Sequence, residues 1–150
     1  MKPRQRRARL PARLEAVLST PVEEVMHRGV ITCTPETGLA TVARMMAGHR
    51  IHAVVVRDEE DEQAHGIVSD LDLVGSATDG AFERRTAREL AATDALAVRA
   101  DEPLERVVGL MREYATSHLV VVDRSGRPVG VVSSLDVIEA LSELDGPSGA

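Results

Sequence analysis

Two short polar clusters carry the chemistry that this sequence offers. Each has the form Ser-x-x-Asp and follows a glycine and two β-branched residues: Ser69 with Asp72, and Ser133 with Asp136. A carboxylate accepts hydrogen bonds only, so such a cluster can hold the donors of a ligand. The same spacing before an apolar run is typical of a capping box, in which the acid reaches back to the backbone. We expect the serine to serve both roles but the aspartate only one, since its oxygens cannot face the backbone and a ligand together.

The two clusters belong to a longer repeat. Residues 66–74 return as residues 130–138, and each copy follows a run of valines, at 54–56 and at 120–122. A repeat of roughly sixty-five residues indicates two similar structural units. Because neither unit covers its own sheet well, we expect the two to pack on each other.

Each unit predicts the order strand, helix, strand, strand, helix, which makes the fold class α/β, doubled with pseudo-two-fold symmetry. The first helix of each unit has an apolar face, at Leu39, Val42 and Met46 and at Leu104, Val107 and Met111. We expect these faces to be incompletely covered and to support a homodimer. The expected divisions are a basic arm with a short helix (1–19), a first unit (20–74), a linker (75–85), a second unit (86–145) and a disordered tail (146–150).

Composition excludes several classes of function. Residues 1–13 hold six basic residues and no acid, which leaves 12 of the 18 basic residues against all 24 acids in the rest. An acidic body disfavours nucleic acid, and Phe82 and Tyr114 are the only aromatic residues that could stack on bases. A lone Cys33 permits no internal disulfide. We see no nucleophile with a base and no metal-ligand spacing, so we expect no enzyme and no metal.

The chain is expected to be cytoplasmic. Its first residues lack the apolar stretch of a signal peptide, and no segment reaches the length of a membrane span. Without a partner for disulfide formation, Cys33 fits a reducing compartment.

The landmarks resemble the CBS (cystathionine-β-synthase) domain family, as a tandem pair often called a Bateman module. The matching stretches are residues 25–26, 34–35, 52–56 and 66–74 in the first unit, with 118–122 and 130–138 in the second. The resemblance covers about residues 20–144 and implies a regulatory, stand-alone pair that forms disc-like dimers. It also implies a cleft for AMP, ADP, ATP or S-adenosylmethionine, with no required cofactor and an unknown regulated protein.

The resemblance also assigns roles to residues. The two aspartates would bind ribose hydroxyls, the serines and two histidines would lie near phosphates, and a threonine would lie near adenosine. The expected ligand contacts are Thr34, His52, Ala53, Val54, Ser69, Asp72, His118, Leu119, Ser133 and Asp136.

The sequence departs from the family pattern at the phosphate pocket. Ala100 stands where we match Thr34 in the second unit, and Leu71 and Leu135 replace a hydroxyl before the aspartates. Ala53 and Leu119 occupy a position that can hold arginine. A weak or single-site binder is therefore one expectation, and a ligand without a polyphosphate is another. The alternative is a dimerising adaptor whose nucleotide sites have decayed and whose Ser-x-x-Asp clusters only cap helices.

Overall fold

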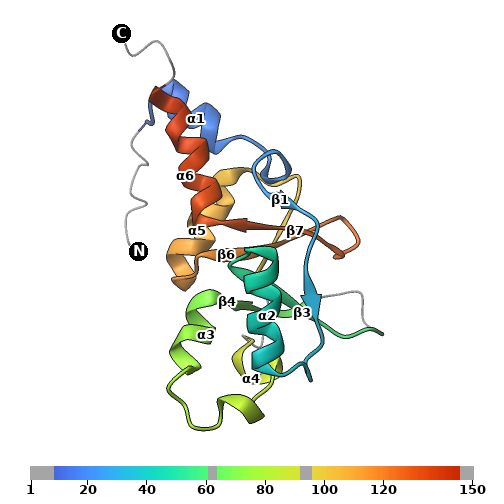
Figure 1. The fold of residues 1–150 in the computed structure, drawn as a ribbon. Helices are drawn as coiled ribbons and strands as arrows, with labels where there is room; N and C mark the ends of the chain where they lie inside the picture. Colours follow the sequence, from blue (N-terminus) through green and yellow to red (C-terminus); the bar gives the residue numbers. More distant parts are fainter. Residues whose placement is uncertain (1–8, 61–63, 92–95, 146–150) are drawn as a thin grey trace, which may run out of the picture.

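The computed structural model describes residues 9–60, 64–91 and 96–145 (Figure 1). The basic residues before Arg9, the middle of the acidic loop (61–63) and the tail (146–150) lie outside this part, so the expectations for them stay predictions. The elements are α1 (Ala12–Leu18), η1 (Val22–Glu24), β1 (His27–Arg28), β2 (Thr32–Cys33), α2 (Leu39–His49), β3 (Ala53–Arg57), β4 (Ala64–Ser69), α3 (Asp70–Ser76), η2 (Phe82–Arg84), α4 (Ala87–Leu90), β5 (Ala97–Arg99), α5 (Leu104–Tyr114), β6 (His118–Val122), β7 (Pro128–Ser133), α6 (Ser134–Ser142) and η3 (Glu143–Asp145).

Two small sheets form the centre of the molecule. One has the order β2-β3-β4, and the other has the order β1-β7-β6-β5. In each, a parallel strand and an antiparallel hairpin partner flank a central strand, which confirms the predicted strand, helix, strand, strand, helix units. Strand β1 precedes the first sheet in sequence but joins the second, where His27 is paired with Val131.

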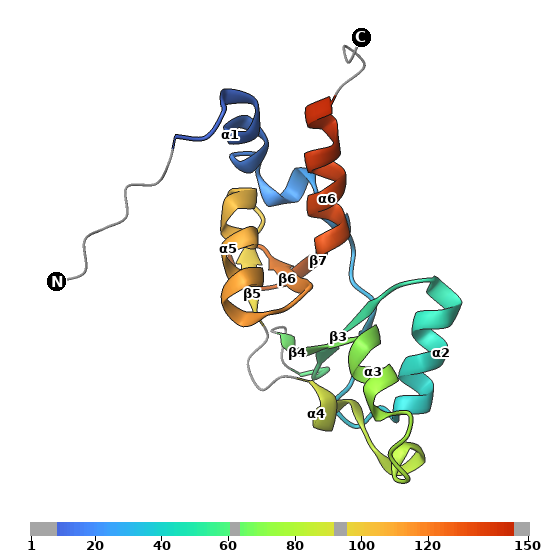
Figure 2. The ribbon, with the colours of Figure 1, turned by 90° about the vertical axis from the view of Figure 1, so that its left-hand side faces the viewer.

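The sheets lie against each other and the helices lie outside them (Figures 1 and 2). Val54 and Val56 pack with α2 in one core, while Val121 packs with α5 in the other. Successive side chains of a strand alternate between the two faces of a sheet. Val55 and Val120 therefore point away from these cores, and both are fully buried because the other sheet covers them. Strand β4 contacts β6 across this contact layer.

The apolar helix faces lie inside these cores. Leu39, Val42, Leu104 and Val107 have no exposed surface. The predicted helices with one apolar face are confirmed, but the expectation that these faces are incompletely covered is wrong for these four residues, so they give no support to a homodimer. Each of these helices packs on its own sheet and on a short segment that belongs to the other repeat in sequence.

These segments cross between the repeats. Val22 of η1 is buried in the core of the second unit, and Ala87 of α4 is buried in the core of the first. Backbone hydrogen bonds fix both crossings: the Val22 N–H donates to the Glu102 carbonyl at 2.9 Å, and the Ala87 N–H donates to the Thr37 carbonyl at 2.8 Å. The expected ranges of the two units stay a prediction, and each core also takes in a short segment from the other range.

The ladders define which residues of the two repeats correspond. Ala53 is paired with Ser69, and His118 with Ser133, so Ala53 and His118 are counterparts. Matching the valine run 54–56 with 120–122 was therefore wrong by one position, and the true match is 119–121. The second hairpin is one residue shorter between its strands, because Arg57 is paired with Ala64 and Val122 with Pro128.

A close backbone contact at Gly130 holds β1 on the second sheet. A Cβ atom at this position would lie 2.8 Å from the Met26 sulfur and would overlap the His27 carbonyl oxygen. Only glycine leaves room for β1 to pair here. The glycine before the second Ser-x-x-Asp cluster thus serves the sheet at this point.

We predict that Gly130→Ala lowers the free energy of unfolding by about 1–3 kcal/mol, because β1 must move away from β7 to relieve the overlap. Gly109→Ala is the matched control. It lies in the interior of α5 with open space around it, so alanine should stabilise the protein by about 0.8–1 kcal/mol. Urea unfolding of both variants tests this, and equal stabilities of Gly130→Ala and wild type would contradict the contact.

Candidate functional site

The first Ser-x-x-Asp cluster forms a complete capping box at the start of α3. The Ser69 hydroxyl accepts a hydrogen bond from the Asp72 N–H at 3.3 Å, and Asp72 Oδ2 accepts one from the Ser69 N–H at 2.9 Å. Asp72 is exposed, and no described residue bonds to its Oδ1. Capping uses one carboxylate oxygen and leaves the other open, so the expectation that capping excludes ligand contact does not hold for Asp72.

Asp70 closes the first turn of α3 to anions. Its Oδ1 accepts a hydrogen bond from the Leu71 N–H at 2.8 Å, and its Oδ2 lies 2.9 Å from His52 Nδ1. The Asp70 N–H itself donates to the His52 carbonyl. Partial burial raises the pKa of Asp70, but the bonds from His52 and Leu71 outweigh it and hold the pKa below its ordinary value. The carboxylate of Asp70 thus accepts a backbone hydrogen bond at the start of α3, where we expected a phosphate of the ligand.

The second cluster is also a complete capping box, but its aspartate is enclosed. Asp136 Oδ2 accepts hydrogen bonds from the Ser133 N–H at 2.8 Å and from the Ser133 hydroxyl at 3.1 Å. Its Oδ1 lies 2.9 Å from His27 Nε2, and the side chain of Asp136 is only 2% exposed. Both oxygens therefore have partners within the chain.

His118 lies between the two clusters. It is buried in β6 on the face toward the other sheet, and its Nδ1 lies 3.0 Å from the Ser117 hydroxyl. Burial lowers the pKa of His118, although Asp70, Asp136 and Asp72 act in the opposite direction. His118 has Ala53 as its counterpart, so His52 and His118 are not a matching pair. The counterpart of His52 is Ser117, whose carbonyl accepts the Ser134 N–H as that of His52 accepts the Asp70 N–H.

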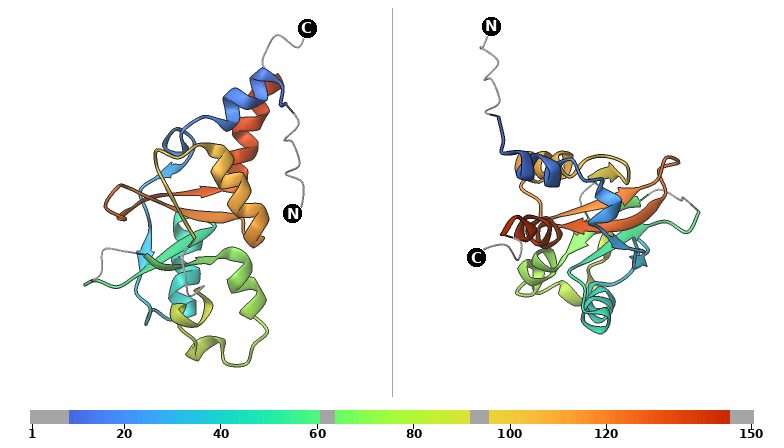
Figure 3. Two further views of the ribbon diagram at one scale, coloured as in Figure 1. Left: turned by 180° about the vertical axis from the view of Figure 1, so that it is seen from behind. Right: turned by 90° about the horizontal axis from the view of Figure 1, so that it is seen from above.

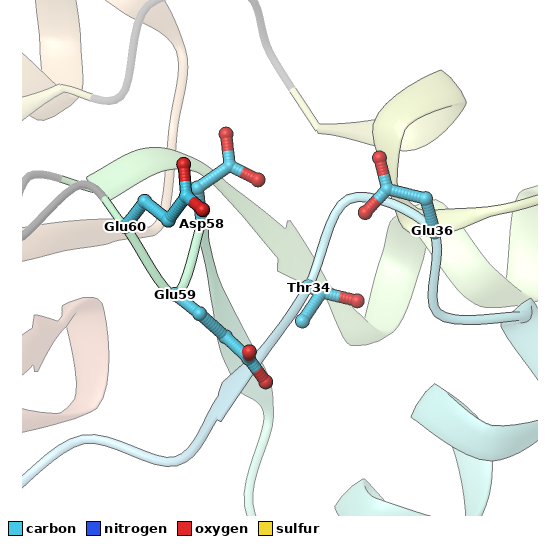
Figure 4. A pocket seen from close by; sticks show the side chains of 5 residues that line it. All are labelled: Thr34, Glu36, Asp58, Glu59 and Glu60. Atoms are coloured by element: carbon cyan, nitrogen blue, oxygen red, sulfur yellow. The ribbon is translucent and has the colours of Figure 1, made fainter.

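Thr34 lies at the rim of an acidic pocket (Figure 4). Its hydroxyl lies 3.0 Å from that of Thr37, which also accepts the Thr34 N–H. The other residues that line the pocket all carry carboxylates: Glu36, Asp58, Glu59 and Glu60. Glu36 forms an ion pair with Arg88 at 2.6 Å.

The counterpart of Thr34 in the second unit is Arg99. The ladders pair Cys33 with Val56 and Val98 with Val121, which places Thr34 and Arg99 at the same step. Our match of Thr34 with Ala100 was therefore wrong. Arg99 Nε donates to Asp101 at 3.1 Å, so a cation stands where the first unit has a hydroxyl.

Three further predicted contacts, Ala53, Val54 and Leu119, lie within β3 and β6. Val54 and Leu119 are fully buried in the cores beside the helices, so only their backbone could reach a ligand between the sheets. Ala53 lies on the opposite face and is nearly buried. The ligand roles of the ten predicted residues stay predictions. The sequence analysis did not identify Asp70 and His27 as residues of these clusters. Asp70 has no acidic counterpart in the second cluster, and His27 is distant in sequence from Asp136.

Neither a membrane span nor a metal cluster occurs within the described ranges. No helix there is long and apolar enough to cross a bilayer. No group of three or more His, Cys, Asp or Glu side chains in the same ranges is arranged to hold a metal ion.

The comparisons with known proteins now assign the fold. The sequence profile of the CBS domain matches residues 22–78 and 87–143. The chain therefore belongs to the CBS domain family, and it holds two tandem copies of the domain. An uncharacterized protein of Methanopyrus kandleri is 30% identical over 81% of this chain, and L-aspartate semialdehyde sulfurtransferase of Methanocaldococcus jannaschii is 26% identical over 79%. The chain spans 62% of the first relative and 22% of the second.

Solved structures show the same pair. The CBS domain pair of protein MJ0100, in complex with 5′-methylthioadenosine and S-adenosyl-L-methionine, has a TM-score of 0.76 at 24% identity and covers 83% of this chain and 98% of its own. The CBS domain of a bacterial CNNM/CorC family Mg²⁺ transporter in complex with ATP has a TM-score of 0.74 at 22% identity, covering 87% and 92%. These likenesses confirm the predicted tandem α/β fold.

We predict that His118 makes stability depend on pH. Its pKa is lowered by folding, so the unfolded chain takes up a proton near pH 6.5 that the folded chain resists. The stability that this residue gives is complete above pH 6.5 and is lost as the pH falls toward its folded pKa. In His118→Gln the drop in melting temperature between pH 7.5 and pH 5.5 should be smaller than in wild type.

The matched control is His49→Gln, at the exposed end of α2, which should keep the wild-type drop. Thermal unfolding at several pH values between 5.5 and 7.5 measures all three proteins. The same drop in His118→Gln as in wild type would refute the role of His118.

Proposed function

We propose that this CBS pair is a regulatory module which binds an adenosine-containing ligand between its repeats and thereby modulates a partner protein. It acts without catalysing a reaction or requiring a cofactor, and it works in the cytoplasm. The observation that carries the proposal is the open Oδ1 of Asp72, held in place by a capping bond on its other oxygen. Pairs of the same fold are known in complex with S-adenosylmethionine, 5′-methylthioadenosine and ATP.

The capping bond prepares Asp72 for this role. A carboxylate fixed through Oδ2 loses little further conformational freedom when Oδ1 accepts a hydroxyl of ribose. The resulting hydrogen bond is charge-assisted and hence stronger than one between neutral groups. The same cluster therefore serves as helix cap and as ribose contact.

The first unit favours a ligand without phosphates. The N–H groups of Asp70, Leu71 and Asp72 at the start of α3 already donate within the chain, and the Asp70 carboxylate brings a negative charge there. A polyphosphate would meet repulsion from this carboxylate at the start of α3, whereas a neutral methylthioadenosine or a sulfonium cation would not. We therefore propose S-adenosylmethionine or 5′-methylthioadenosine in preference to ATP.

One observation supports the alternative of a ligand-free adaptor. Asp136 is fully engaged by Ser133 and His27, as a purely structural cap would be. If Asp72 also serves only as a cap, neither cluster binds a ligand, and the CBS pair is an adaptor that works by binding other proteins. Ligand binding by variants of Asp72 separates the two functions.

We predict that Asp72→Asn weakens binding of S-adenosylmethionine about ten- to a hundredfold, the loss expected for a hydrogen bond to a charged group. Asparagine keeps an acceptor for the Ser69 N–H, so the free energy of unfolding should fall by less than about 1 kcal/mol, the value of an acid in the first turn. Isothermal titration and urea unfolding measure the two effects.

Ser69→Ala is the matched control for the cap. It should cost about 0.5–2 kcal/mol of stability and leave the Asp72 charge in place. ATP and 5′-methylthioadenosine serve as comparison ligands, with methylthioadenosine expected to bind more tightly than ATP. Wild-type affinity for S-adenosylmethionine in Asp72→Asn would rule out the ribose contact, and no binding of any of these ligands to wild type would leave the adaptor.

We also propose a homodimer that uses a different surface from the one expected. Four large apolar side chains are more than half exposed, Leu71 and Val74 on α3 and Leu135 and Ile138 on α6. They occupy matching positions of the two repeats, and Figure 2 faces the side on which both helices lie. A two-fold interface brings the same patch of two subunits together, so a patch that is itself nearly two-fold suits a second copy of the chain.

We predict that the wild-type chain sediments as a dimer at micromolar concentration and that Leu71→Glu together with Leu135→Glu makes it a monomer, because buried charges without partners oppose association. Tyr114→Glu is the control, since Tyr114 is an exposed large side chain on a different helix, α5. A wild-type monomer, or a dimer that survives the double substitution, would contradict this interface.

A further inference from the structure

We propose that His27 closes the second nucleoside site by occupying the carboxylate oxygen that a ribose would need. His27 is thus a specificity-determining residue that makes the two repeats unequal: the site at Asp72 is open, and the site at Asp136 opens only when the imidazole leaves. This inference rests on the proposed function, because it assumes that both aspartates belong to ribose sites.

The contacts and the burial of Asp136 leave a ligand little access to its carboxylate oxygens. One oxygen accepts the Ser133 N–H and hydroxyl, and the other lies 2.9 Å from His27 Nε2. The carboxylate is 2% exposed, whereas the first unit leaves Asp72 exposed with one oxygen free of described partners. The same motif is therefore presented to solvent in one repeat and covered in the other.

The backbone of His27 is fixed while its ring is free to move. Strand β1 is paired with β7 through His27 and Arg28, and the Gly29 N–H donates to the Val129 carbonyl at 2.9 Å. Gly130 leaves no space between β1 and β7, which sets the position of the His27 backbone. The side chain of His27 is nevertheless 76% exposed, so its ring can turn into solvent without disturbing the core.

A ribose hydroxyl and the imidazole N–H are equivalent partners for Oδ1. Each donates a hydrogen bond to a carboxylate that would otherwise lie buried without a donor, which is costly. Exchange of one for the other keeps Asp136 satisfied. The imidazole is attached to the chain and therefore competes at a high effective concentration, so a free ligand binds here more weakly than at Asp72.

Titration calorimetry with S-adenosylmethionine on the full chain tests the proposal by the number of ligands bound per chain. His27→Ala should raise that number by one relative to wild type, or raise the affinity of a weak second site at least tenfold. The double variant His27→Ala with Asp136→Ala should abolish the gain. His27→Gln, whose amide can still donate, should behave as wild type, and Arg28→Ala on the same strand should leave the number unchanged.

The outcomes separate the two proposals. An unchanged number of ligands and unchanged affinities in folded His27→Ala would overturn the closing role of His27, while binding at Asp72 would stand. No binding in wild type and in His27→Ala would overturn the proposed function and this inference with it. If His27→Ala does not fold, ¹⁵N spectra of the His27 ring in wild type decide. A shift in these ring signals at ligand excess beyond saturation of the first site supports displacement, and no shift refutes it.

Discussion

The structure depends on two backbone crossings in which each repeat completes the core of the other. The Val22 and Leu104 N–H groups donate to the Glu102 and Thr20 carbonyls, and the Ala87 and Leu39 N–H groups donate to those of Thr37 and Arg85. These bonds fix the starts of α5 and α2 as well as the segments beside them. Because Val22 and Ala87 are fully buried, neither sheet has its complete helical cover without them. The two repeats therefore form one continuous framework (Figure 3).

Identical motifs have unequal environments within this framework. Ser69 and Ser133 cap their helices in the same way, yet the neighbour of the first is Asp70 and that of the second is Ser134. The carboxylate of Asp70 adds a second acid to the first turn of α3, while α6 has only Asp136 in its first turn. His27 reaches the second cluster from a strand that belongs to the first repeat in sequence. The two copies thus differ in the surroundings of their clusters while they share one fold.

Much of the fold could be predicted from the sequence, because apolar periodicity, turns and repetition are all local or direct signals. The one-residue error between the repeats has a physical cause. Strands β3 and β6 are buried on both faces, so their residues do not alternate between apolar and polar. A run of valines therefore does not indicate which residues of the two strands correspond. The register is set instead by hairpin lengths, which differ by one residue. The sequence indicated that both Ser-x-x-Asp clusters could cap helices, and both do. It could not show that the cap uses only one carboxylate oxygen of Asp72, because this depends on the side-chain geometry. The contact between His27 and Asp136 joins residues more than a hundred positions apart and leaves no local pattern.

The crossings also bear on how such a chain could arise. A single repeat would lack the short segment that covers its sheet, and the gap would have the shape of the segment carried by an identical copy. Two separate copies could fill each other's gaps as a domain-swapped pair, in which each chain supplies its leading helical turn to the other. Gene duplication followed by fusion converts that swapped pair into one polypeptide without changing any contact. Fusion also removes the requirement that the copies be identical, so afterwards one half is free to acquire residues such as Asp70 that the other half never has.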